Sequence, residues 1–476
     1  MLLCNKKQIN PLALIVIKWY NVHMLNPKGL TLLSKIINTI QSKFYLRLIL
    51  AYLAGVIMFA FVALTSGNLA ECPLWLGFYG SLLCFAYILP IIAERDIPLA
   101  YMAVSAVAVA ALAYVRISMF YYQSGDYGSF LYHWVEQMRG MSLTEAMKAD
   151  IGDYNMPYLY ILFAISRAKI NDLYLIKLVS CLFDGLAAFF VMKIVGHFRK
   201  GAVARIVAFV ATLALPTVWL NGAFWGQCDV VFASLCLGMV WAILKGKGNL
   251  ATILWALAFA FKLQAIFALP LLIIALFTKR IKPLSLVWIV PVFFATLVPA
   301  LLCGRAFGDC IKIYFEQADQ YPQMHLNIPS IWTLLGHVSF DNFNAAAIFL
   351  AGSALVVFLL LCYHWREAID DKKLMTLFFI GALLIPFLLP RMHDRYYFLA
   401  DVAALALFLI DFKRWYVPLV TVLSSYAGYR YFVMGGEVLF DHKYFAIAIL
   451  VMLTIMIKDT FKEMAEKSSQ PTLLKG

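Results

Sequence analysis

The chain has 476 residues, of which 63% are hydrophobic and only 14% are charged. Soluble domains are about 45–50% apolar and about 25% charged, because a protein surface in water needs charge. The composition therefore excludes a soluble globular enzyme, a disordered protein and a nucleic-acid reader. It predicts an all-α, polytopic integral membrane protein that performs chemistry or transport at a bilayer.

The net charge of +13 comes from 39 basic and 26 acidic side chains. Lys and Arg gather in the cytoplasmic loops of membrane proteins, so the excess marks loops rather than a site for a polyanion. The nine cysteines are scattered without a CxxC pair, which is typical of small buried side chains.

The predicted spans begin after a lysine-bearing arm, residues 1–43, that we expect in the cytoplasm. Apolar runs follow at 45–66, 73–93 and 98–119, each near the length of about 20 residues that a helix needs to cross a bilayer. The polar stretch 120–171 comes after the third run. Counting the crossings places this stretch outside the cell.

Later basic clusters agree with this topology if 249–278 enters and leaves on one side, as two short helices that break near Lys262. The sequence then predicts one membrane domain over 44–460 with about 13 or 14 spans. A cytoplasmic tail follows at 461–476, so both termini are cytoplasmic. The clusters are Arg199-Lys200-Arg205, Lys245-Lys247, Lys279-Arg280-Lys282, Arg366-Lys372-Lys373, Lys413-Arg414 and Lys458-Lys462-Lys467.

The outer stretch 120–171 is predicted to be helical. Residues 127–139 have helical spacing, and Ser142 with Glu145 forms a capping-box pattern that opens a second short helix. Residues 154–166 form an amphipathic or re-entrant helix. This first extracytoplasmic loop is where we expect catalytic residues.

Asp126 stands directly after the third run, in "SGDYGSFLYHWVEQMR". A carboxylate at the membrane edge, with aromatic residues such as Trp134 beside it, suits a general base. Capping of the following helix is the alternative. Asp153 and Tyr154 in "IGDYNMPYLY" are expected to bind the acceptor or the sugar, or Asp153 is a turn residue. No D-x-D spacing joins Asp126 to Asp153, so we expect neither a metal nor another cofactor.

The turn "NGAFWGQCDVVFA" holds Trp225, Gln227 and Asp229. An Asp at the start of a span is costly unless it is paired or lies in a wet cavity. We assign these three residues to acceptor or sugar binding. Alternatively, Asp229 caps its helix and Trp225 is an interfacial aromatic residue.

Four cationic or ionisable residues are predicted to bind phosphate. Lys262 lies between long apolar stretches, where it needs an anion or a cavity unless it reaches the interface. Arg391, His393 and Arg395 in "LLPRMHDRYYFLADV" form an outer cluster that opposes the usual charge bias. Contacts with a phosphate would explain the cluster, and pairing of Asp394 with a local Arg is the alternative.

These groups suit one reaction. Attack on the anomeric carbon of a lipid-phosphate sugar needs a base for the acceptor hydroxyl and cations for the departing phosphate. Asp126 would be the base. Lys262, Arg391, His393 and Arg395 would bind the phosphate.

The same motifs resemble those of GT-C glycosyltransferases. "GDYGSFLYHWVEQM" is similar to "GDYEAxRHWME" of the dolichyl-phosphate-glucose-dependent glucosyltransferases, "GDYNMPYLY" to their "DYPPLTAY", "FKLQAIFALP" to their "FKQMALYYAP" and "MHDRYYF" to their "HEKSIL". The set "FWGQCDVVFA", "FKLQAIFALP", "IPSIWTLL" and "RMHDRYYFLA" resembles bacterial relatives of the GPI-type mannosyltransferases. The similarity covers most of residues 98–400 in the same order.

The resemblance implies an inverting, metal-independent transfer of a hexose, mannose or glucose. The donor would be a polyprenyl-phosphate sugar, and the acceptor a glycan or a lipid-linked molecule. The active site would face the extracytoplasmic side of a membrane that we expect to be a bacterial inner membrane. The resemblance maps the base onto Asp126 and the phosphate site onto His393 and its neighbours. The chain departs from the pattern at two places. It has a single proline, Pro157, displaced by one residue, where "DYPP" has two, and it has Arg395 where the related motif has Lys.

Three rival functions differ in their sequence patterns. A transporter or lipid-linked glycan flippase should place its charges at the bilayer midplane and contain paired repeats. A polysaccharide polymerase would lack the Asp126 motif directly after a span. A membrane scaffold would not need Lys262 together with the cluster from Arg391 to Arg395.

Overall fold

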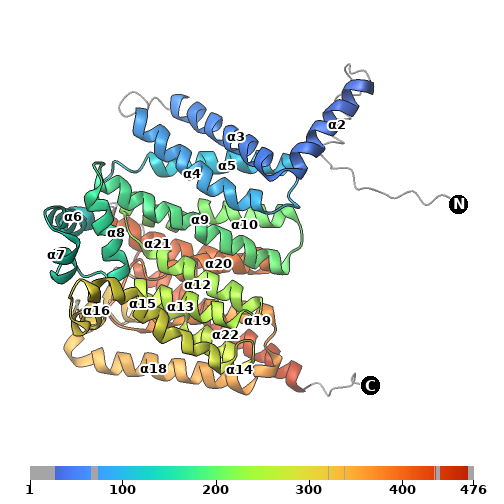
Figure 1. Cartoon of the computed structure of the whole chain (residues 1–476). Coiled ribbons are helices and arrows are strands. Elements are labelled where there is room, and N and C mark those ends of the chain that lie inside the picture. The colour runs from blue at the N-terminus through green and yellow to red at the C-terminus, as the bar shows by residue number, and fades with distance from the viewer. Residues whose placement is uncertain are drawn as a thin grey trace. The chain divides into compact units, whose positions relative to one another are not determined.

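A computed structural model describes residues 27–65, 73–319, 321–336, 338–433, 435 and 440–469 (Figure 1). Within these ranges the chain is almost entirely helical. The strands are two pairs of residues, β1 (His325–Leu326) and β2 (Met392–His393), which pair in parallel. The predicted all-α, polytopic class is confirmed. Much of the predicted N-terminal arm, residues 66–72 between the first two apolar runs and the end of the predicted tail lie outside the described residues.

The chain divides into two compact units. Unit 1 comprises residues 1–118 and 201–206, and unit 2 comprises residues 119–200 and 207–476. This division does not test the expected single membrane domain over 44–460, which stays a prediction. The described helices of unit 1 are α2 (Pro27–Ser42), α3 (Phe44–Thr65), α4 (Pro73–Ala93) and α5 (Leu99–Ile117).

In unit 1, α3, α4 and α5 pack against one another pairwise. The turn between α4 and α5 is held by two buried or partly buried arginines. Arg205 Nη1 lies 2.5 Å from the carboxylate of Glu94. Arg47 is 2% exposed and donates to the Glu94 carbonyl at 2.9 Å and to the Ile97 carbonyl at 3.2 Å. These bonds satisfy a cation that would otherwise be costly to bury.

Unit 2 is built around α12 (Asp229–Leu244), in which Trp241 alone is not buried. A helix that is apolar on all sides belongs in the interior, and α9, α13 and α20 pack around it. Its other helices are α9 (Asp172–Phe198), α11 (Pro216–Trp219), α13 (Gly248–Phe261), α14 (Leu269–Phe277), α15 (Ile289–Leu302), α16 (Phe307–Asp319), α17 (Ile331–Leu335), α18 (Phe340–His364), α19 (Asp371–Leu388), α20 (Phe398–Ile410), α21 (Tyr416–Val433) and α22 (His442–Ser469), with the loop helices described below; α10 (Ala202–Ala214) begins in unit 1.

Six of the described helices are long and apolar enough to cross a membrane. A bent pair, Ala202–Ala214 with Pro216–Trp225, would make a seventh. Five further apolar helices have 10–17 residues, which is short for a full crossing. The expectation of about 13 or 14 spans therefore requires crossings by several short helices, and it stays a prediction.

The predicted break at Lys262 is confirmed. Helix α13 ends at Phe261, Lys262 has an extended backbone with φ −156°, and a tight helical turn, η4 (Leu263–Ala268), leads into α14. The break places a lysine at the end of an apolar helix, inside the unit.

The loop 120–171 forms the predicted short helices, namely the π-helical turn η2 (Tyr127–Leu131), α6 (Tyr132–Arg139), α7 (Leu143–Lys148) and α8 (Met156–Arg167). The capping box is confirmed, because Ser142 Oγ accepts from the Glu145 N–H and Glu145 Oε2 accepts from the Ser142 N–H. Arg167 donates to the carbonyls of Met138 and Met141, which ties α8 to α6.

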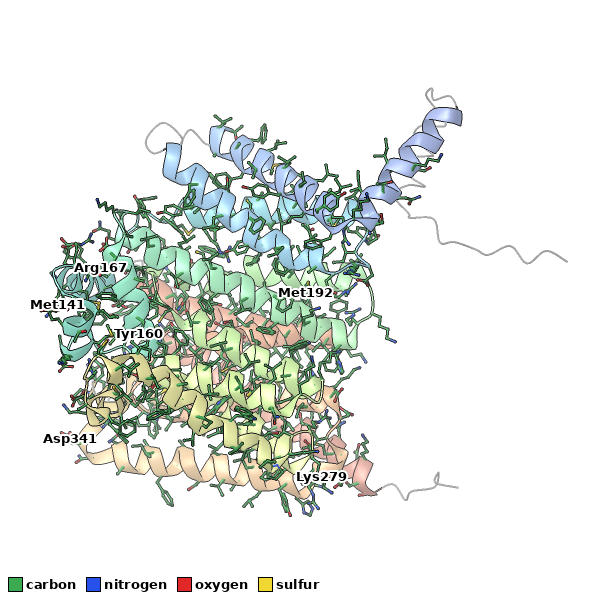
Figure 2. The ribbon with its side chains drawn as sticks, viewed as in Figure 1. Met141, Tyr160, Arg167, Met192, Lys279 and Asp341 are labelled. Atoms are coloured by element: carbon green, nitrogen blue, oxygen red, sulfur yellow. The ribbon has the colours of Figure 1, made fainter. Side chains whose placement is uncertain are left out.

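These loop helices gather with α16 at one end of unit 2 (Figure 1). Tyr160 secures them to α15, since its hydroxyl donates to the Thr296 carbonyl at 3.0 Å and accepts from the Ala300 N–H at 3.1 Å. Figure 2 shows Met141, Tyr160 and Arg167 at this end, and Lys279 of a predicted cytoplasmic cluster at the opposite end. Lys279 and the loop helices thus lie at different ends of unit 2, and the sidedness of the two ends stays a prediction.

Candidate active site

Asp126 is held by two side chains from a distant turn. Its Oδ2 atom accepts from Trp225 Nε1 at 2.9 Å and from Gln227 Nε2. The carboxylate makes no capping bond to η2, which begins at the next residue, so the capping alternative is not supported. The Arg395 Nη1 atom lies 3.9 Å from Oδ2. These contacts orient one oxygen and leave the other without a hydrogen bond among the described residues.

A sharp turn presents Trp225 and Gln227 to Asp126. The π-helical turn η3 (Leu220–Trp225) ends at Gly226, whose φ of +84° lies in the left-handed region that favours glycine. The Ser124 hydroxyl donates to the Trp225 carbonyl at 2.6 Å, which ties this turn to the segment that carries Asp126. π-Helical turns are often found at functional sites. Here η2 follows Asp126 directly, and η3 ends at Trp225.

Asp229 and Lys262 form a buried ion pair, with 2.5 Å between Lys262 Nζ and Asp229 Oδ1. Asp229 is 1% exposed, and its Oδ2 accepts from Asn221 Nδ2 at 2.9 Å and lies 3.7 Å from Arg395 Nε. The pairing explains how an acid can begin a buried helix. It also means that Lys262 does not extend to an interface as an isolated cation.

A cavity of about 230 Å³ joins most of the predicted site. It lies in unit 2 and is bounded by the start of η2, the break after α13, the end of α16 and the loop after α19. Trp225 and Asp229 do not line the cavity. They lie behind residues that do, since Trp225 contacts Asp126, and Asp229 contacts Lys262 and Arg395. The predicted residues that line it are Asp126, Trp134, Asp153, Tyr154, Gln227, Lys262, Arg391, His393 and Arg395.

The loop after α19 is fixed by the pairing of β2 with β1. Arg391 has a φ of +63°, and its N–H lies within hydrogen-bond reach of the carbonyls of Gln323 and Met324. The ring of His393 lies between Tyr321 and Tyr396, with centroid distances of 4.8 Å and 5.2 Å. The loop is thus held in one conformation although it contains few regular backbone bonds.

Charge in this loop is set by burial and by neighbouring cations. Burial, with the positive charges of Arg395 and Lys262, holds the pKa of His393 well below its usual range, so the imidazole is neutral. Burial raises the pKa of Asp394 to about 7, although the Arg395 charge opposes the shift. The Oδ1 atom of Asp394 is buried without a hydrogen bond among the described residues, whereas the Arg395 backbone N–H and charge both act on the carboxyl group.

Lys177 is a structural residue of the site that the sequence analysis missed. It is fully buried in α9, and its Nζ donates to the carbonyls of Met119, Phe120 and Tyr122 at 2.9, 3.3 and 2.6 Å. These carbonyls belong to the segment that leads to Asp126. A lysine inside a predicted span was the available signal. Other unpredicted residues line the cavity, namely Gln264, Gln317, Tyr321, Asn327, Asp394 and Tyr396.

In the described part of the chain, no three His, Cys, Asp or Glu side chains converge as a metal site would require. The cavity brings the carboxyl groups of Asp126, Asp153 and Asp394 together with the cations of Lys262, Arg391 and Arg395.

An all-helical membrane fold with this cavity agrees with the comparison to known families. Residues 154–390, about half of the chain, match the model of glycosyltransferase family 87. The match supports a transferase of the GT-C-like membrane glycosyltransferase class. It includes Gln227 and Lys262, whereas Asp126 precedes it and Arg391 follows it directly. No curated protein matches the chain.

Proposed function

We propose that the protein is an inverting hexosyltransferase that uses a polyprenyl-phosphate sugar and passes mannose or glucose to a glycan or a lipid-linked acceptor. The observation that carries the proposal is the Asp126 carboxylate in one cavity with Lys262, Arg391, His393 and Arg395. A base and a phosphate-binding group of cations are the two elements that this transfer needs.

In the proposed step, the acceptor hydroxyl donates its proton to Asp126 while its oxygen bonds to the anomeric carbon. The bond between that carbon and the phosphate oxygen breaks, and the electron pair leaves with the polyprenyl phosphate. Arg395 and Lys262 stabilise the negative charge that develops on the leaving group. Neutral His393 supplies a hydrogen bond rather than a charge.

Trp225 and Asp229 act differently from the predicted sugar contacts in this scheme. Trp225 donates to Asp126, and Asp229 contacts both Lys262 and Arg395. We assign both as positioning residues. Trp134, Asp153 and Tyr154 line the cavity and keep the proposed sugar or acceptor role.

We also place the cavity at the extracytoplasmic face of a bacterial inner membrane, with both termini in the cytoplasm. The support is the distribution of basic clusters along the chain, together with the position of Lys279 opposite the loop helices (Figure 2). On this side the donor headgroup and a cell-envelope acceptor would meet at the membrane boundary.

Asp126→Asn tests the base. The amide oxygen can still accept from Trp225 and Gln227, but it cannot take a proton, so we expect a loss of about 10²–10⁴-fold in kcat with donor binding retained. Purified protein is incubated with undecaprenyl-phosphate mannose or glucose and a panel of acceptors, and release of undecaprenyl phosphate is followed. Glu136→Gln, at an exposed acid on α6, is the matched control and should keep full activity. Near-normal turnover by Asp126→Asn would refute the assignment.

A further inference from the structure

A second cavity, of about 440 Å³, adjoins the first in unit 2. Asp153 and Gln317 line both. The second cavity lies between the loop helix α7 with the turn after it and helix α16. None of the residues assigned to phosphate binding lines it.

Seven of the ten residues that line this cavity are charged, and both signs are present. Its cations are Lys148, Arg305 and Lys312, and its acids include Asp150, Asp309 and Glu316. A lipid chain gains nothing from such walls, because it would remove charges from water without pairing them. A carbohydrate suits them, since each hydroxyl can accept from a cation and donate to a carboxylate.

The walls of the cavity are held in place. Arg305 is 7% exposed, and its Nη1 donates to the Ala149 carbonyl at 2.9 Å and contacts the Met147 carbonyl at 3.3 Å, which ties the start of α16 to the end of α7. On the exposed face of α16, Lys312 and Glu316 form an ion pair at 2.6 Å. A cavity with a fixed outline can select a ligand without first being ordered by it.

A chain of side-chain contacts leads from this cavity to the base. Gln317 Nε2 donates to the Asp153 carbonyl and to Asn155 Oδ1, and these bonds form the partition between the cavities. On the other side of the partition, the Tyr154 hydroxyl donates to Gln227 Oε1 at 3.2 Å, and Gln227 donates to Asp126. A ligand in the second cavity therefore lies beside the partition formed by Asp153 and Gln317, and the contacts that lead to the Asp126 carboxylate begin on the other side of it.

We infer that the second cavity binds the hydrophilic glycan part of the acceptor and delivers its hydroxyl past Asp153 to Asp126. The inference rests on the proposed function and deepens it, because it names the acceptor as a carbohydrate bound through its hydroxyls by charged side chains. In this scheme the donor phosphate occupies the first cavity, beside Lys262 and Arg395.

The test uses two variants at exposed residues of α16 that do not line the first cavity. Glu316→Trp fills the cavity, and Lys312→Ala with Glu316→Ala removes its charge pair. Full-length protein is assayed with undecaprenyl-phosphate mannose or glucose and radiolabelled di- and tetrasaccharides of mannose, glucose and galactose. We expect KM for the saccharide to rise about tenfold or more, because charge-assisted hydrogen bonds are lost or blocked.

Two readouts separate this inference from the proposed function. Donor KM, and the slow hydrolysis of the donor without an acceptor, should not change in the α16 variants. Glu136→Trp on α6, an exposed acid outside both cavities, should leave every constant unchanged. If saccharide KM stays at its wild-type value in both α16 variants while Asp126→Asn is inactive, the acceptor site is refuted and the transferase survives. If Asp126→Asn remains active, the proposed function itself fails.

Discussion

Two carboxyl groups in the cavity lie in contrasting surroundings. Asp126 is oriented by the indole of Trp225 and the amide of Gln227, and its side chain is 19% exposed. Asp394 is 2% exposed and has a buried oxygen without a hydrogen bond among the described residues. The surroundings of Asp126 suit a carboxylate that contacts a substrate. The surroundings of Asp394 favour the protonated, neutral form, because burial disfavours the charged form.

Asp394 should make the stability of the protein depend on pH. Because burial raises its pKa to about 7, the folded chain holds a proton on Asp394 at pH values where the unfolded chain has released it. The free energy of unfolding should therefore fall as pH rises from about 4 to about 7, by about 1.4 kcal/mol for each unit of pKa shift. Asp394→Asn is always neutral and should lose this dependence.

The measurement is thermal unfolding in detergent between pH 5 and pH 8. The asparagine variant should gain stability relative to the wild type as pH rises. Asp309→Asn, at an exposed acid on α16, serves as the control. Parallel pH curves for the wild type and Asp394→Asn would contradict the raised pKa.

Arg395 should matter more than His393 for donor binding. The guanidinium is within 4.0 Å of both Asp126 and Asp229, whereas the imidazole is neutral. Arg395→Ala should weaken donor affinity by about 10–100-fold, and His393→Ala by about tenfold or less. Arg395→Lys keeps the charge but loses the planar fork, so an intermediate value is expected. Titration with undecaprenyl-phosphate mannose or glucose measures this order, and unchanged affinity in both alanine variants would exclude the phosphate site.

At the scale of elements, the site is built at helix ends. Asp126 directly precedes a π-helical turn, Asp229 begins α12, Lys262 follows α13, and the loop of His393 follows α19. Helix ends leave backbone groups unsatisfied, so they need local partners. Lys177 provides such a partner for the segment before Asp126, because its ammonium group donates hydrogen bonds to three carbonyls of that segment.

Lys177→Met tests this link between α9 and the base. The change leaves three buried or partly buried carbonyls with no ammonium donor, so we expect a loss of about 1–3 kcal/mol in stability. The kcat of the variant should fall below the wild-type value, because Asp126 is displaced. Donor affinity should be largely kept, because the phosphate site is not displaced. Lys193→Met, on the same helix outside the cavity, is the control. A Lys177→Met variant with normal kcat would show that the lysine only stabilises the fold.

At the scale of the molecule, the site depends on segments far apart in the chain. The family match covers residues 154–390, and the cavity unites this stretch with Asp126 before it and Arg391 after it. The charges meet at helix ends rather than along helix middles. The match to a glycosyltransferase family, rather than the position of the charges, favours an enzyme over a flippase.

The sequence by itself determined the helices and named many of the residues that line the first cavity. Apolar runs set the spans, the Ser142–Glu145 spacing set a helix start, and the polar interruption at Lys262 set a break, because each depends on neighbours within a few turns. Tertiary structure alone decided that Asp229 pairs with Lys262, that Trp225 holds Asp126 and that a second cavity adjoins the first. These contacts join residues that are separated by many turns of helix. A sequence pattern does not specify how far apart in space such residues lie.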